Sequence, residues 1–297
     1  MTATIRARKS SEPAAGGQTV RPSVAQAVAK AAADESVRLG LEHRLWAASA
    51  HLLWERAGVH PGDVVLDLGC GPGHATMDLA QIVGPEGLVI ALDENPNFLK
   101  QLGEQASARR LEHVERVLGD AQDLAGVLAH HEGKVDVVFA RWLFAYPPRP
   151  RAIIDGARKM LKPGGRLVIQ DFVNLRRGTT MVPRSEAMDR FHTALDASFR
   201  GAQRDPDVIE QLPRMLVEAG LTIAHLDSHQ RLARPGEPLW HWPRCMIEGF
   251  LPGMIASGQM TTGDGAALLA SWDESAKLPY AFAYLPPLMD LIGRKDA

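Results

Sequence analysis

The sequence is poor in the features that mark secreted, metal-binding and membrane-spanning proteins. It contains only two cysteines, Cys70 and Cys245, among 297 residues. Two cysteines do not make a disulfide framework in a chain of this length, and no set of Cys and His residues has the spacing of zinc ligands. No apolar run approaches the ~20 residues that a membrane-spanning helix needs. We therefore expect no metal site, no membrane span and a cytoplasmic location.

The chain also lacks an excess of positive charge. Its formal net charge is -2, whereas domains that bind DNA or RNA through the phosphates are usually strongly basic. Nucleic acid is therefore not expected as a partner. Hydrophobic residues make up 45% of the chain, which excludes a wholly disordered protein and is enough for a sizeable core. The length fits one large domain or two small ones.

The N-terminal part divides into two stretches of different composition. Residues 1–22 are rich in Ala, Gly, Ser, Thr and Arg without periodicity, which predicts a disordered tail. A transit peptide is the alternative for this tail. Residues 23–57 predict a helix that ends at Gly58, because apolar side chains recur there at near-helical spacing: Val37, Leu41, Leu45 and Leu52.

Short apolar runs then alternate with helical segments. The runs are apolar on successive residues, which suits strands that are buried on both faces. We expect strands at 64–68, 88–92, 114–118, 135–140 and 166–170. The helices between them are expected near 74–83, 97–110, 121–130 and 150–161. This alternation predicts an α/β fold with a doubly wound, mostly parallel sheet.

The rhythm changes after Asp171. Helices are expected at about 184–200 and 206–219, and further strands at 221–226 and 280–285. We interpret this half as a helical insertion over the strand ends, followed by the closing strands of the same sheet. A separate small domain is the alternative.

The first strand leads into a glycine-rich turn, residues 64–74, with the sequence VVLDLGCGPGH. Gly69 and Gly71 allow the backbone to turn sharply and approach a ligand, and the following helix offers free N–H groups to an anionic group. A dinucleotide fingerprint requires glycine or alanine where His74 stands. Asp67 would repel a pyrophosphate but can attract a cation, such as the sulfonium and ammonium of S-adenosylmethionine.

This turn resembles motif I of class I S-adenosylmethionine-dependent methyltransferases, and further motifs follow in order over about residues 63–171. The resemblance implies that Asp93 binds the ribose hydroxyls and that Gly119-Asp120-Ala121 recognises adenine. It implies that Arg141-Trp142 faces the site of methyl transfer, and residues 161–167 are typical of the approach to the fifth strand. The expected cofactor-binding residues are Asp67, Gly69, Cys70, Gly71, Asp93, Asp120, Ala121 and Arg141.

The chain is most similar to the small-molecule branch related to ubiquinone/menaquinone-type methyltransferases. The Asn/Asp-Pro-Pro-Tyr/Phe motif of nucleic-acid amino-methyltransferases is missing, since Ala145-Tyr146-Pro147-Pro148 has a different order. The resemblance implies a Rossmann-like, seven-stranded sheet at 58–171 and beyond, an N-terminal helical lid at 23–57 and a helical cap with closing strands at 172–297. It also implies methyl transfer to a small, partly apolar acceptor by proximity and in-line alignment. A protein or RNA methyltransferase and a non-catalytic S-adenosylmethionine binder are the alternatives.

Three side chains are candidates for catalysis, and each has a structural interpretation as well. His43 lies on the N-terminal helix and could contact the acceptor, or be a surface or packing histidine. His192 lies in the helix that covers the acceptor pocket in relatives, and is a candidate base. Tyr146 could point into the pocket or pack its own loop. A lid exchanged between subunits would make a homodimer, which stays open.

Overall fold

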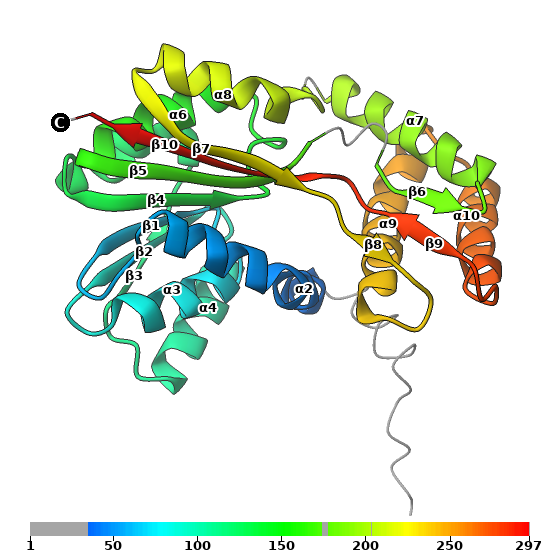
Figure 1. Ribbon diagram of the computed structural model, residues 1–297, viewed down its shortest axis with the longest axis horizontal. Helices are drawn as coiled ribbons and strands as arrows, with labels where there is room; N and C mark the ends of the chain where they lie inside the picture. The colour runs from blue at the N-terminus through cyan, green and yellow to red at the C-terminus, as the bar shows by residue number, and fades with distance from the viewer. Residues whose placement is uncertain (1–34, 174–177, 203, 297) are drawn as a thin grey trace, which may run out of the picture.

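The computed structural model describes residues 35–173, 178–202 and 204–296, and in these ranges the chain builds a seven-stranded sheet of order β3-β2-β1-β4-β5-β10-β7 (Figure 1). Five parallel strands come from residues 64–172: β1 (Val64–Leu68), β2 (Leu88–Asp93), β3 (Val114–Leu118), β4 (Val135–Arg141) and β5 (Leu161–Phe172). The antiparallel β10 (Leu288–Lys295) lies between β5 and the edge strand β7 (Leu221–His229).

Helices cover both faces of this sheet. On one face lie α2 (Glu35–Arg56), α3 (His74–Val83) and α4 (Pro96–Ala108), and on the other lie α6 (Pro150–Met160) and α8 (Val208–Glu218) (Figure 1). The strand order reverses between β1 and β4, which is where ligands bind in doubly wound sheets. The predicted Rossmann-like, seven-stranded fold is confirmed.

The central strands are buried because their sequences are apolar on successive positions. In β4, Val137, Val138 and Phe139 are fully buried, although their side chains alternate between the two faces. Val138 packs with the α6 and α8 side, while Val137 and Phe139 pack with the α2 and α3 side. The two apolar layers fix the sheet between its helices and so fix the positions of the strand ends.

Two expectations from the sequence need correction. The run at 280–285 does not close the main sheet: β9 (Phe282–Tyr284) pairs instead with β6 (Thr180–Val182) and β8 (Leu232–Ala233) in a separate three-stranded sheet. The seventh strand is β10, whose apolar pattern is interrupted by Asp290 and by Gly293 at a bulge. The helix expected at 121–130 is broken into η1 (Ala121–Asp123), α5 (Leu124–Val127) and η2 (Ala129–His131).

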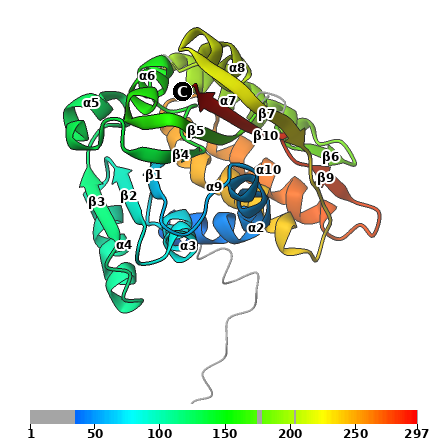
Figure 2. The ribbon, with the colours of Figure 1, turned by 60° about the vertical axis from the view of Figure 1, so that its left-hand side comes forward.

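A second apolar core lies beyond the carboxyl ends of the main strands (Figures 1 and 2). It is built by α7 (Glu186–Gly201), α9 (Pro238–Ala256), α10 (Thr262–Ser275) and the small sheet, which together we call the cap. Trp46 of α2 joins the cap to the main sheet, since its ring centroid lies 5.3 Å from Phe172 and 5.7 Å from Trp242. Helix α2 is therefore packed against both the main sheet and the cap.

Part of the expected N-terminal organisation lies outside the described residues. The tail at 1–22 and the first part of the expected helix, 23–34, fall there. The rest of that helix is α2, which ends at Arg56 near the expected position. None of the described helices is long and apolar enough to cross a membrane.

Candidate active site

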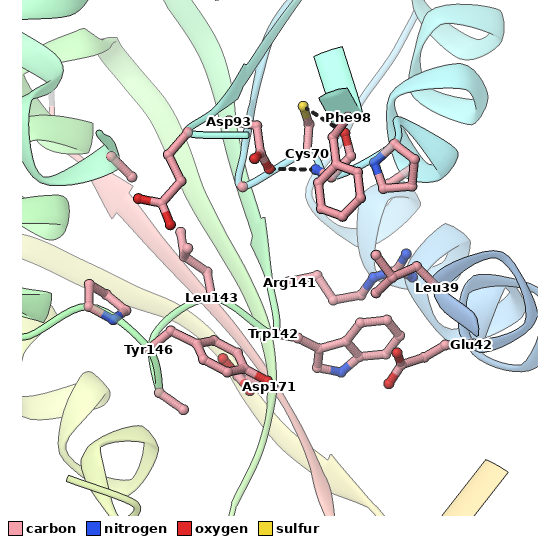
Figure 3. Close-up of a pocket in the computed structure, with 18 of the residues that line it drawn as sticks. Leu39, Glu42, Cys70, Asp93, Phe98, Arg141, Trp142, Leu143, Tyr146 and Asp171 are labelled. Carbon is pink, nitrogen blue, oxygen red and sulfur yellow. Dashed lines mark hydrogen bonds between the residues drawn. The ribbon is translucent and has the colours of Figure 1, made fainter. Parts of the chain in front are cut away.

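A cleft of about 600 Å³ opens at the carboxyl ends of β1, β2, β4 and β5 and is covered by α2, α7 and α9 (Figure 3). One end is formed by the glycine-rich turn and the ends of β2 and β3, and we call it the donor end. The other end is formed by the loop after β4 and by the cap, and we call it the acceptor end. Donor-end residues include Gly69, Cys70, Gly71, Asp93, Phe98, Asp120 and Ala121; acceptor-end residues include Trp142, Leu143, Tyr146, Phe172, Phe199 and Phe250.

The glycine-rich turn depends on backbone conformations that favour glycine. Gly69, Gly71 and Gly73 have φ angles of 65°, 55° and 89°. A Cβ on Gly73 would lie 2.3 Å from Cδ1 of Leu102, which is fully buried. Gly73 also caps α3 without a side-chain hydrogen bond, so the start of this helix presents its backbone N–H groups to the cleft.

Asp93 connects the end of β2 to the glycine-rich turn. Its Oδ2 accepts the N–H of Gly71 at 2.8 Å (Figure 3), and its Oδ1 accepts the N–H of Asn95 at 2.8 Å. Each carboxylate oxygen can accept a further hydrogen bond. The carboxylate is therefore held rigidly at the cleft wall, with remaining capacity to accept hydroxyl protons.

Asp67 and Arg141 place opposite charges at the floor of the cleft. Asp67 is 2% exposed, and its Oδ2 accepts the hydroxyl hydrogen of Thr76 at 2.6 Å. Burial raises the pKa of Asp67 to about 6, against the lowering effects of Thr76 and Arg141. Burial likewise lowers the pKa of Arg141 to about 10, although Asp67 and Glu42 oppose this shift. The floor thus holds a buried carboxylate whose charged form a bound cation would stabilise.

Arg141 is fixed through His43 of helix α2. The Nη2 of Arg141 donates to Nδ1 of His43 at 2.7 Å, and Nε2 of His43 lies 3.0 Å from Oδ2 of Asp78. Because a guanidinium only donates, Nδ1 accepts and Nε2 carries the proton that Asp78 receives. Burial alone raises the pKa of Asp78, but hydrogen bonds from His43 and His51 lower it to about 2. His43 therefore positions Arg141 in this arrangement.

The loop after β3 forms the outer wall of the donor end. Asp120 is exposed at the cleft, and its Oδ1 accepts the backbone N–H of Gln122 at 2.8 Å, so it caps η1. Ala121 is 9% exposed and also lines the cleft. Cys70 lies in the turn itself, where burial raises the pKa of its thiol well above the usual value. All eight residues expected to bind cofactor line this one cleft.

Aromatic side chains form the acceptor end. The rings of Trp142 and Phe172 stack at 5.8 Å with an interplanar angle of 7°. Tyr146 lies across from them, near Phe199 of α7 at a ring distance of 6.3 Å. Tyr146 is 42% exposed as a whole residue, but desolvation on its cleft side raises its pKa to about 12, and the nearby carboxylates of Glu42 and Asp171 act in the same direction. This end is suited to an apolar or aromatic ligand.

Asp171 shapes the loop that carries Trp142. Its Oδ2 accepts the N–H of Phe144 at 3.2 Å, and its Oδ1 accepts the N–H of Phe172 at 2.9 Å. Trp142 itself has a φ angle of 54°, a left-handed conformation that is uncommon for a large side chain. Burial raises the pKa of Asp171 to about 7. Asp171 was not predicted as a site residue. The signal that identified Asp93, an acidic residue at the end of a strand, would have applied to Asp171 as well.

Glu42, a buried carboxylate of α2, also lines the cleft and was not predicted from the sequence. Its Oε1 accepts the indole N–H of Trp242 at 3.0 Å, and its Oε2 lies 3.3 Å from Nη1 of Arg38. Burial raises the pKa of Glu42, while Arg38 and Trp242 lower it. No sequence signal marks Glu42, because a polar residue on a helix is ordinarily solvent-exposed.

The structure separates the three catalytic candidates. Tyr146 and His43 line the cleft, whereas His192 does not. His192 packs against Gly178, and its Nε2 accepts the N–H of Thr179 at 3.2 Å. Burial lowers the pKa of His192 to about 4. The structure thus places His192 outside the cleft, where its side chain holds a backbone N–H.

Comparisons with known proteins agree with this geometry. A family model described as "Methyltransferase domain" matches residues 59–220. An arsenite methyltransferase from Halobacterium salinarum is 32% identical over 164 residues, which is 55% of this chain and 38% of that protein. A demethylmenaquinone methyltransferase from Lactococcus lactis is 35% identical over 127 residues, 43% of this chain and 48% of that protein. The chain thus matches half or less of each of these relatives.

A solved structure shows the same fold. Geranyl diphosphate C-methyltransferase from Streptomyces coelicolor superposes with a TM-score of 0.52 at 15% identity, over 85% of this chain and 77% of that one. The identity is too low to carry the function over. The family match, in contrast, covers more than half of the chain and includes the glycine-rich turn and every parallel strand of the main sheet. The chain belongs to the methyltransferase domain family, and S-adenosylmethionine is the cofactor that its motifs and its relatives indicate.

Proposed function

We propose that the chain transfers a methyl group from S-adenosylmethionine to a small, partly apolar organic acceptor that binds among the aromatic rings of the cleft. One observation carries this proposal: the rigid, polar donor end and the aromatic acceptor end share a single cleft of about 600 Å³. That volume is in the range of small-molecule sites.

The donor end offers a partner for each part of the cofactor. The carboxylate of Asp93 would accept the ribose hydroxyl protons, because both of its oxygens are already oriented by backbone N–H groups. Asp120 and Ala121 would contact the adenine. Asp67 lies where it would favour the positive charges of the ammonium and sulfonium groups.

Arg141 would bind the carboxylate of the methionine part. Its Nη1 is buried and has no hydrogen-bond partner among the described residues, while Nη2 is held by His43. An unpaired buried guanidinium N–H is costly, and a carboxylate is its preferred acceptor. The loss of solvation at Arg141 would then be offset only when the cofactor is bound.

Methyl transfer from a sulfonium requires correct alignment of the acceptor more than it requires an activated side chain. A lone pair of the acceptor attacks the methyl carbon, the S–CH₃ bond breaks, and its electron pair stays on sulfur to give S-adenosylhomocysteine. The protein would supply proximity, in-line orientation and exclusion of water. An oxygen or nitrogen acceptor must also release a proton, either to solvent or to Asp171, a carboxylate that lines the cleft and whose pKa burial raises to about 7. Tyr146 would not take this proton, because its own pKa is raised to about 12.

A macromolecular acceptor fits this cleft less well. Helices α2, α7 and α9 cover the acceptor end, and its walls are aromatic and aliphatic side chains. A protein or RNA substrate requires an open groove that admits a chain, and RNA also favours basic residues around it. The relatives named arsenite methyltransferase and demethylmenaquinone methyltransferase also support a small acceptor.

Calorimetry with S-adenosylmethionine and S-adenosylhomocysteine tests the donor site. We expect micromolar binding to the wild type and a loss of about tenfold or more in Asp93→Ala, which corresponds to about 1.4 kcal/mol. Asp63→Ala is the matched control, since Asp63 also accepts a backbone N–H, from His60 at 3.0 Å, but lies before β1, outside the cleft lining. Equal affinity in all three proteins would refute the role of Asp93.

Turnover separates an enzyme from a binding protein. Small phenols, amines and activated carbon acids would be screened as acceptors, with S-adenosylhomocysteine formation as the readout. Acceptor-dependent product supports methyl transfer. Tight cofactor binding without product from any acceptor would favour the non-catalytic alternative.

A further inference from the structure

Three potential metal ligands meet outside the cleft, at the edge strand β3. Glu115 projects from the edge strand β3, and His130 and His131 form the end of η2. One ligand atom from each residue lies within 4.8 Å of the others. None of the three lines the cleft, so the methyl-transfer site does not explain the cluster. The sequence analysis found no zinc-ligand spacing because the carboxylate comes from a strand that precedes the two histidines.

The distances in this cluster are close to those that a small divalent metal ion requires. The Nε2 of His131 lies 3.1 Å from Oε2 of Glu115, and the Nε2 of His130 lies 3.6 Å from Oε1. In a tetrahedral zinc site with bonds near 2.0–2.1 Å, neighbouring ligand atoms are about 3.3 Å apart. These two separations, each to a different oxygen of Glu115, lie within about 0.3 Å of that value. All three ligand atoms lie within 4.8 Å of one another, so side-chain rotations would be needed to bring them around one ion.

The two histidines converge on one acceptor. The imidazole rings of His130 and His131 lie 4.0 Å apart and both reach the same carboxylate. One divalent metal ion could bind two neutral imidazoles and this carboxylate together, which leaves a single positive charge on the whole site.

We propose that Glu115, His130 and His131 form a binding site for a borderline divalent transition-metal ion such as Zn²⁺. Three protein ligands leave a fourth position for water, as in open zinc sites. His131 is 9% exposed, whereas the side chain of His130 is 65% exposed, so the ion would enter from the solvent side. The bound ion would tie η2 to the edge strand β3 and stabilise the segment between β3 and β4.

Zinc titration of the chelator-treated full chain tests the site. We expect one Zn²⁺ per wild-type chain and at least about tenfold weaker binding in His130→Ala and in Glu115→Gln, since changing even an outer partner of a ligand costs 10–100-fold. His60→Ala is the matched control. The side chain of His60 is also 65% exposed and also contacts a carboxylate, that of Asp63 at 3.1 Å, but it belongs to no three-ligand group found among the described residues.

Thermal unfolding gives an independent readout. Zn²⁺ should raise the Tm of the wild type and of His60→Ala, and should leave the Tm of His130→Ala unchanged. Because His130 is exposed, its substitution should not impair folding, and the Tm without metal checks this. No zinc binding to the wild type, or equal binding to the wild type and to both ligand variants, would overturn the proposal. Equal loss in His60→Ala and His130→Ala would overturn it as well.

Discussion

The guanidinium of Arg141 donates to Nδ1 of His43 across 2.7 Å and so couples the end of β4 to helix α2. The same guanidinium lies 4.4 Å from the ring centroid of Trp142, at the boundary between the donor and acceptor ends. Arg141 therefore links helix α2, the donor end and the acceptor end. Its Nη1 is buried and has no hydrogen-bond partner among the described residues, so this N–H remains able to donate to a ligand.

Arg141→Lys should weaken S-adenosylmethionine binding by about tenfold or more, or about 1.4 kcal/mol. A lysine keeps the charge but cannot bond His43 and a ligand carboxylate in the same fork geometry. Decarboxylated S-adenosylmethionine is the discriminating probe, because it lacks the group that Nη1 would bind. Its affinity should be nearly the same for wild type and variant. If both cofactors lose affinity equally, Arg141 acts on the site as a whole and not on the carboxylate.

Binding of S-adenosylmethionine should weaken as the pH falls through about 6, the pKa to which burial raises Asp67. A cationic ligand favours the carboxylate form, which is present above this pH and is lost below it. Without ligand, the folded chain holds a proton at Asp67 between pH 3.8, the ordinary pKa of an aspartate in an unfolded chain, and about 6, so this group lowers stability as the pH rises through that window.

Calorimetry between pH 5 and 8 measures this dependence, and Asp67→Asn should flatten it, because the amide does not titrate. Thr76 can still donate to the amide oxygen in this variant, as it does to Oδ2 of Asp67 at 2.6 Å. The variant should therefore fold, and circular dichroism checks that it does. A pH profile that is unchanged in Asp67→Asn would assign the titration to another group.

Glu42→Ala should destabilise the chain by about 3 kcal/mol, the usual effect of removing one partner from a buried ion pair. It leaves the indole N–H of Trp242 without its acceptor and Arg38 without its buried carboxylate. Glu42→Gln keeps an acceptor for Trp242 and should cost about 1 kcal/mol. Urea unfolding followed by tryptophan fluorescence measures both values. Equal losses in the two variants would mean that the charge on Glu42, and not its hydrogen bond to Trp242, stabilises the contact between α2 and α9.

The donor end was accessible from the sequence because it depends on local features. The turn needs glycine where φ is positive, as at Gly71, and parallel strands must bring their carboxyl ends to one edge. Asp67 and Asp93 are adjacent in space for that reason alone. The acceptor end depends instead on how the cap packs, and the cap has no motif. Glu42 reaches the cleft only because Trp242 of α9 and Arg38 hold it there.

The errors in the strand predictions after Asp171 have the same cause, because tertiary contacts decide those strands. The run at 280–285 is apolar enough to be a strand of the main sheet, but β9 pairs with β6 and β8, and only non-local pairing decides this. Strand β10 was missed because Asp290 and Gly293 interrupt its pattern. Both are explained by tertiary contacts: Oδ1 of Asp290 accepts from Gln170 at 2.8 Å, and a Cβ on Gly293 would lie 2.6 Å from Leu216. The position of His192 next to Gly178, outside the cleft, likewise depends on packing that its sequence neighbourhood does not reveal.

Gly73→Ala should be costly for two separable reasons, and Gly62 provides the control. The two glycines have almost the same φ, 89° and 90°, but a Cβ on Gly62 would meet nothing within 4 Å. Gly62→Ala therefore measures the left-handed backbone conformation alone, about 1 kcal/mol. Gly73→Ala adds the collision with Leu102, where a Cβ would lie 2.3 Å from Cδ1, and should cost about 2 kcal/mol more.

The collision can be tested by removing the atoms that cause it. In a double-mutant cycle, Leu102→Ala opens a cavity that the new methyl group of Gly73→Ala can enter, so the two losses should sum to more than the loss in the double variant. Urea unfolding measures the stabilities. The affinity for S-adenosylmethionine should fall in Gly73→Ala and recover in the double variant, because Gly73 caps the start of α3. Purely additive losses would place the defect of Gly73→Ala in its backbone conformation, and the affinity for cofactor should then not recover in the double variant.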